Sequence, residues 1–91
     1  MKKVYIEDIG QHEGKEVTIS GWLYNKRSSG KLYFLLVRDG TAMIQCIVSE
    51  ADVPEDTFKA AEEVTQESSL TVTGMISADK RAPGGYELQT K

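Results

Sequence analysis

Three side chains of different chemistry lie within one short stretch of this 91-residue chain: a guanidinium at Arg27, an aromatic ring at Phe34 and an amide at Gln45. Residues 21–45, which hold them, have the alternating pattern of successive β-strands. A guanidinium pairs with phosphate, a ring stacks on any base, and an amide hydrogen-bonds a base edge in either direction. The combination is typical of a surface that holds an unpaired nucleotide.

Both the ring and the amide also have an ordinary structural explanation. Phe34 stands in a strand that is apolar on both faces, so periodicity does not decide between a stacking platform and a core residue. Gln45 stands in an otherwise apolar strand, where a polar group needs a partner or water, and a solvent-facing amide would satisfy that need. Their convergence on one face of two neighbouring strands is what favours a binding site.

The charges of the chain are unevenly distributed. The net charge of -3 at pH 7 argues on its own against a polyanionic partner. Basic residues nevertheless cluster near the first predicted hairpin, where Lys26, Arg27 and Lys31 could meet phosphate, and acids gather over residues 50–67. A domain with such a dipole can steer a polyanion to one face. Near the C-terminal end, Glu87 could accept from a base, or be a charge at the rim of the domain.

Size and composition bound what the chain can do. We expect a single domain over residues 1–91, with no membrane helix and no signal peptide. The one cysteine, Cys46, excludes an internal disulfide and fits a reducing cytoplasm. One histidine and one cysteine predict no metal site. We expect no catalytic residue either, because the sequence holds no phosphate loop and no nucleophile motif.

Strand and helix patterns follow one another in a definite order. Alternation predicts strands over residues 16–24, 31–38, 42–48, 68–76 and 86–90. A helical period over residues 54–64, with Pro54 at its start, separates the third strand from the fourth. Residues 4–9 fit a turn of helix or an edge segment, and turn-forming residues predict loops over 11–15, 25–30 and 82–85, with a tight turn at Asp39-Gly40.

This order predicts an all-β fold with one helix, the five-stranded Greek-key barrel known as the OB-fold. Gly21, inside the first strand, indicates a bend or bulge of the kind that a small curved barrel needs. A ferredoxin-like fold would need a helix between the first two strands. An SH3-like barrel would lack the helix that residues 54–64 predict.

A sequence pattern spread over nearly the whole chain resembles the N-terminal anticodon-binding domain of class IIb aminoacyl-tRNA synthetases, the aspartyl, asparaginyl and lysyl enzymes. Its motifs are Gly21-Trp22, Lys26-Arg27, Gly30, Phe34, Arg38-Asp39-Gly40, Gln45 and Thr73-Gly74. Within the family the chain is most similar to the asparaginyl enzymes, on the evidence of residues 27–31, 38–41 and 82–88.

The resemblance implies a role for each candidate residue. Phe34 would stack on the middle anticodon base, a uridine in both the aspartate and the asparagine tRNAs, and Gln45 would hydrogen-bond that base. Arg27 would contact the anticodon-stem backbone or a neighbouring base, and Glu87 would help to read a flanking base. The implied partner is a tRNA anticodon stem-loop of asparagine or aspartate type, whose splayed bases are accessible to a protein.

The whole enzymes of this family activate an amino acid with ATP and magnesium in a separate C-terminal domain, which has no counterpart in this sequence. The resemblance therefore implies a cytoplasmic tRNA-binding module without cofactor or catalysis, monomeric by itself and derived from a homodimeric, ATP-dependent asparagine–tRNA ligase. Three alternatives stay open at this point: an aspartyl-type anticodon domain, a generic single-strand-binding OB module and an OB scaffold that binds protein.

Overall fold

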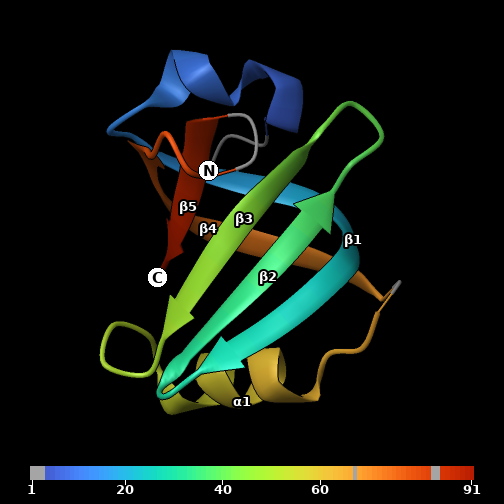
Figure 1. Ribbon diagram of the computed structural model, residues 1–91, viewed down its shortest axis with the longest axis vertical. Helices are drawn as coiled ribbons and strands as arrows, with labels where there is room; N and C mark the ends of the chain where they lie inside the picture. Colours follow the sequence, from blue (N-terminus) through green and yellow to red (C-terminus); the bar gives the residue numbers. More distant parts are fainter. Residues whose placement is uncertain (1–3, 67, 83–84) are drawn as a thin grey trace.

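The computed structural model describes residues 4–66, 68–82 and 85–91 (Figure 1). The elements are the 3₁₀ helix η1 Ile6–His12, the helix α1 Glu55–Glu63 and the strands β1 Glu16–Ser29, β2 Leu32–Arg38, β3 Met43–Ser49, β4 Ser69–Ala78 and β5 Tyr86–Thr90. The strands close into a barrel in the order β1-β2-β3-β5-β4. The predicted all-β OB-fold, with a helix between its third and fourth strands, is thereby confirmed.

The inside of the barrel determines which side chains reach its outside. The fully buried side chains are Ile19, Leu23, Val37, Ile44, Cys46, Val48, Ile76 and Leu88. Because successive side chains of a strand point to opposite faces, a buried Leu35 and Val37 turn Phe34 outward, and a buried Ile44 and Cys46 turn Gln45 outward. The structure therefore settles the face of Phe34, which the sequence had left open.

Strand β1 extends well beyond the residues that the sequence predicts. Residues 25–30, predicted to be a loop, instead continue the strand as far as Ser29, and Asn25 pairs with Leu36 of β2. That prediction was wrong because pairing with a neighbouring strand overrides a polar, turn-like composition. The hairpin turn itself is only Gly30 and Lys31, and Gly30 has a φ of 60°, which a glycine adopts without strain.

Strand β1 bends where it passes from one neighbour to the other. Its first half pairs with β4 and its second half with β2, and Trp22 has partners on both sides. The bulge lies between Leu23 and Asn25. A Cβ on Gly21 would lie 2.2 Å from the carbonyl oxygen of Arg38, so this position allows a close backbone approach next to the bulge.

The two helices lie at opposite ends of the barrel (Figure 1). In η1, Ile6 and Ile9 are buried in the core, since residues three apart share one side of a 3₁₀ helix. The helical alternative for residues 4–9 is thus confirmed, whereas the predicted loop at 11–15 is wrong for its first two residues. Helix α1 follows Pro54 as predicted, and neither helix of the described chain is long and apolar enough to cross a membrane.

Two further turns were predicted, at residues 82–85 and at Asp39-Gly40, and the structure describes the second more completely than the first. The turn at residues 82–85 lies partly outside the described residues, although the Gly85 N–H donates to the Ala82 carbonyl at 3.0 Å. At the other turn, the Asp39 N–H donates to the Ala42 carbonyl at 3.3 Å and Gly40 has a φ of 96°. The predicted tight turn at Asp39-Gly40 is therefore confirmed.

The Asp39 carboxylate also fastens η1 to the β2–β3 turn. One oxygen accepts from the Thr41 N–H at 2.8 Å, the Thr41 hydroxyl at 2.6 Å and the Ala42 N–H at 3.3 Å. The other accepts from the Ile6 N–H at 2.7 Å. Burial acts to raise the pKa of Asp39, but the hydrogen bonds from Thr41, Ile6 and Ala42 outweigh it and lower the pKa below its ordinary value.

Removing this carboxylate should destabilise the fold in a pH-dependent way. We expect Asp39→Ala to lower the free energy of unfolding at pH 7 by about 1.5–3 kcal/mol, the range for hydrogen bonds to a charged group. Because the folded pKa lies below the unfolded one, this contribution is present above the unfolded pKa and is lost as pH falls through the folded pKa.

Urea unfolding of wild type and variant at several pH values measures this difference. It should shrink in acid, with Asp52→Ala, an exposed aspartate of the β3–α1 loop, as the matched control. A difference that stayed constant into strong acid would contradict a role for the charged carboxylate.

Candidate nucleic-acid interface

Arg27 and Phe34 face each other across the β1–β2 ladder. They are register partners, and the guanidinium carbon of Arg27 lies 4.9 Å from the centroid of the Phe34 ring, within the range of a cation–π contact. Arg27 is exposed and Phe34 is half-buried. The pair presents a flat ring and a planar cation together, and an unpaired base can stack on either of them.

Gln45 and Glu87 belong to the next row of the same surface. Leu36 is paired with Gln45 across β2 and β3, and Gln45 is paired with Glu87 across the parallel strands β3 and β5. Directly paired residues share one face of a sheet, and Leu36 follows Phe34 by two residues on β2, a step of about 6.7 Å. The structure thus brings Arg27, Phe34, Gln45 and Glu87 onto one outer surface. We call this surface the β1-β2-β3-β5 face.

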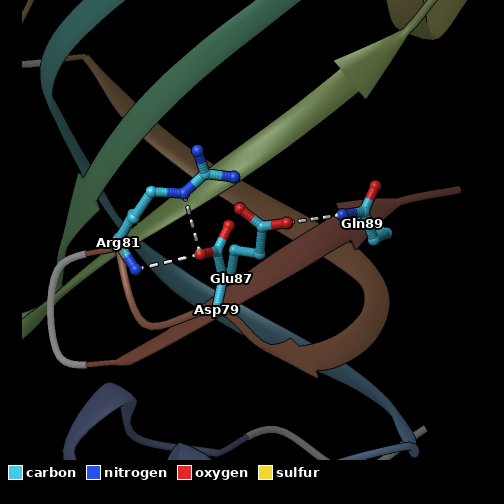
Figure 2. A network of polar contacts seen from close by, with 4 residues as sticks. All are labelled: Asp79, Arg81, Glu87 and Gln89. Carbon is cyan, nitrogen blue, oxygen red and sulfur yellow. Dashed lines mark hydrogen bonds and ion pairs between the residues drawn. The ribbon is translucent and has the colours of Figure 1, made fainter.

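Glu87 lies in a polar network at one edge of this face (Figure 2). Gln89 Nε2 donates to Glu87 Oε1 at 2.9 Å, and Arg81 Nε lies 3.9 Å from Asp79 Oδ1. Glu87 is only 8% exposed, and burial raises its pKa, as does the neighbouring Asp79 carboxylate, while hydrogen bonds from Gln45 and Gln89 act in the opposite direction. The Glu87 carboxyl group is therefore held in place by hydrogen bonds, but these do not fully offset the cost of its negative charge in a buried position beside Asp79.

The two lysines predicted to contact phosphate have very different surroundings. The Lys26 ammonium donates to the carbonyls of Ala61, Glu62 and Val64 at 3.3, 2.7 and 2.7 Å. These are orphan carbonyls at the C-terminal end of α1, where a cation also opposes the helix dipole. Lys31 is exposed in the β1–β2 hairpin turn. Lys31 is therefore accessible to a phosphate group, whereas the Lys26 ammonium is engaged in hydrogen bonds to the carbonyls at the end of α1.

Sequence reasoning missed this helix-capping role and the Glu87 network. The sequence does contain an indication of the helix-capping role. Helix α1 has no basic residue in its last turn, so a cation from elsewhere in the chain would stabilise its C-terminal end. Gln89 and Asp79 could be found only from the pairing of β5 with β3 and β4. Across the described ranges, no three histidine, cysteine, aspartate or glutamate side chains gather as metal ligands would.

Comparison with known proteins identifies the protein family to which this chain belongs. Residues 17–91 match the family model described as the OB-fold nucleic acid binding domain, and the chain belongs to that family. It is 53% identical over 98% of its length to the asparagine–tRNA ligase of Pelotomaculum thermopropionicum, and 45% identical over 98% to that of Thermus thermophilus. The chain spans only 21% and 20% of these two relatives, about one fifth of each.

Solved structures share the fold of this chain over nearly its whole length. The asparaginyl-tRNA synthetase from Pyrococcus horikoshii, complexed with asparaginyl-adenylate, superposes with a TM-score of 0.91 and 40% identity, over 99% of this chain and 21% of that one. The OBody AM3L09 bound to hen egg-white lysozyme superposes with a TM-score of 0.84 over 99% of this chain and 90% of that one. At 23% identity, this second likeness concerns the fold alone.

The two lysines should respond to substitution in opposite ways. Lys26→Gln should lower the free energy of unfolding by about 1–2 kcal/mol, because it removes a cation from the helix C-terminus, and should leave RNA affinity unchanged. Lys31→Gln should leave stability unchanged, weaken binding to a single-stranded nucleic acid and reduce the slope of log affinity against log salt by about 0.7, the value for one phosphate contact on a single strand.

Urea unfolding and titrations at several salt concentrations separate these effects. Lys59→Gln, at an exposed lysine of α1, is the matched control. If Lys26→Gln weakened RNA binding while stability held, the lysine would belong to the interface after all.

The raised pKa of Glu87 predicts a stability change with a definite sign. The pKa of Glu87 in the folded state lies above its ordinary value of 4.5. Its contribution to the free energy of unfolding is therefore fully present below the unfolded pKa and is lost as pH rises through the folded pKa. Glu87→Gln should therefore be more stable than wild type at neutral pH and about equally stable in acid. Urea unfolding from acid to neutral pH measures this, with the exposed Glu63→Gln as the matched control; a Glu87→Gln variant less stable than wild type at neutral pH would contradict it.

Proposed function

We propose that the β1-β2-β3-β5 face binds the anticodon loop of a tRNA, as the anticodon-recognition domain of an asparagine–tRNA ligase. The observation that carries the proposal is the adjacency of two rows on one outer surface, the Arg27–Phe34 stack and the Gln45–Glu87 pair. RNA sequence is read where bases are unstacked and accessible, which is the case in a loop. The similarity to asparagine–tRNA ligases over nearly the whole chain supports the choice of tRNA.

Selection of a middle uridine would follow from the orientation of the Gln45 amide. Gln45 is the register partner of Glu87 on one face of the sheet, and an ionised carboxylate can only accept a hydrogen bond, so the amide nitrogen is the end of the Gln45 side chain that suits Glu87. The carbonyl oxygen of Gln45 is then left as an acceptor for the ligand. Uridine presents the N3–H donor that such an acceptor requires, whereas cytidine presents a lone pair at the same position. Stacking on Phe34 would hold the base while Gln45 reads its edge.

A titration with two matched anticodon stem-loops tests this directly. The first has the asparagine anticodon, and the second has its middle uridine replaced by cytidine. We expect tighter binding of the uridine loop, a loss of about 1–3 kcal/mol for Phe34→Ala, the typical value of a base–aromatic stack, and loss of the uridine preference for Gln45→Ala. Gln11→Ala, at an exposed amide of η1, should behave as wild type.

The contrary outcomes have distinct meanings. Equal binding of both loops would leave only a generic single-strand-binding module. RNA binding that does not weaken with salt would contradict an interface that holds phosphate, since phosphate contacts weaken steeply with salt. Two folded variants, Phe34→Ala and Gln45→Ala, that bind as wild type would place the interface elsewhere.

The remaining properties of the larger enzyme are also proposals. The chain spans about one fifth of the ligases that it resembles, so we propose that ATP, magnesium and amino-acid activation belong to another part of such an enzyme. A cytoplasmic location, a monomeric state of this domain by itself and a homodimeric parent follow from the same resemblance. If the chain were instead an aspartyl-type anticodon domain, its tRNA would have the same middle uridine and would differ in a flanking anticodon base.

A further inference from the structure

A second arginine–aromatic pair lies on the outside of the barrel. Trp22, Arg38 and Met43 are successive register partners across β1, β2 and β3, and they form a row. The guanidinium carbon of Arg38 lies 6.0 Å from the Trp22 ring centroid, so the pair repeats the chemistry of Arg27 and Phe34. Trp22 is 38% exposed and is the one tryptophan of the chain.

This row continues the β1-β2-β3-β5 face. On β2, the side chains of Phe34, Leu36 and Arg38 alternate with the buried Leu35 and Val37, so all three point outward. Arg38 is four residues beyond Phe34, a distance of about 13 Å along the strand. A base stacked on Phe34 cannot also contact Trp22 across this distance, which equals about four steps of the roughly 3.4 Å rise between stacked nucleotides, whereas a triplet extends only one step to either side of its middle base.

The Arg38 guanidinium is available for an anion. The ion pairs among the described residues join Arg81 to Asp79 and Lys91 to Glu16, and none includes Arg38. The adjacent acid, Asp39, has both carboxylate oxygens hydrogen-bonded within its own turn and to η1. An exposed guanidinium without a counter-ion, next to an exposed ring, matches the paired chemistry of a nucleotide, whose phosphate is anionic and whose base is flat.

We propose that Trp22 and Arg38 form a second nucleotide subsite, where the base of a loop nucleotide outside the anticodon triplet stacks on Trp22 while Arg38 holds its phosphate. The inference rests on the proposed function, because it requires RNA to lie on this face. Continuity with the Phe34 row through Leu36 and the unpaired cation favour an RNA strand over a protein. Two linked subsites would bind a loop more tightly than a triplet, since the second contact forms at a high effective concentration.

The single tryptophan provides the test. During titration with the asparagine anticodon stem-loop, Trp22 fluorescence excited selectively should be quenched, with the same Kd as binding followed on a labelled RNA. A free trinucleotide of the anticodon sequence should bind more weakly and leave the fluorescence unchanged. Trp22→Ala should weaken stem-loop binding roughly 5- to 150-fold, the range for one stacked base. Arg38→Gln should also weaken it and should reduce its salt dependence, because a phosphate contact is lost. Both variants should leave trinucleotide binding as in wild type.

Two control variants keep the result interpretable. Trp22→Phe retains a stacking ring and should bind the stem-loop nearly as wild type, which distinguishes lost stacking from a damaged fold. Lys59→Gln removes an exposed cation from α1 and should have no effect beyond a small change in salt dependence.

The outcomes separate this inference from the proposed function. If Trp22 fluorescence stays unchanged in a titration that Phe34→Ala weakens, the second subsite is overturned and anticodon binding stands. If the trinucleotide alone quenches Trp22, the subsite lies within the triplet and the inference is overturned. If the wild-type chain binds neither RNA, both proposals fall.

Discussion

The bend of β1 is the constraint on which the rest of the structure depends. One strand must pair with β4 along its first half and with β2 along its second half. Two close approaches at the closing strands leave no room for a side chain: a Cβ would lie 2.2 Å from the Arg38 carbonyl oxygen at Gly21 and 2.1 Å from the Gln89 carbonyl oxygen at Gly74. With these glycines and the bulge, five short strands can close into a barrel.

The same bend determines where the chemistry of the surface lies. Beyond the bulge at Leu23 and Asn25, the alternation of β1 directs Lys26 to the end of α1 and Arg27 to the ring of Phe34. The two neighbouring cations thus have different roles. Lys26 caps the C-terminal end of α1, whereas Arg27 lies at the solvent-facing surface against the ring of Phe34. The outer face is consequently rich in guanidinium and aromatic groups, although the chain as a whole carries a net charge of -3.

Sequence reasoning recovers what depends on local periodicity and fails where distant strands decide. The core strands β2, β3 and β5, the helix α1 and the Asp39-Gly40 turn were predictable, because alternation and turn chemistry are local signals. The second half of β1 was not, because its polar residues form a strand only through pairing with β2. The face of Phe34, the helix contacts of Lys26 and the network around Glu87 likewise depend on partners far away in the chain.

The central claim, that RNA lies on the β1-β2-β3-β5 face, is tested most directly by mapping backbone amide chemical shifts by NMR during titration with the asparagine anticodon stem-loop. The account predicts that the largest shifts follow the register rows through Phe34, Gln45 and Glu87, and that the amides of α1 stay nearly unchanged. Shifts centred on α1, or on the part of β4 that pairs with β1, would show that the RNA binds elsewhere and would contradict the account.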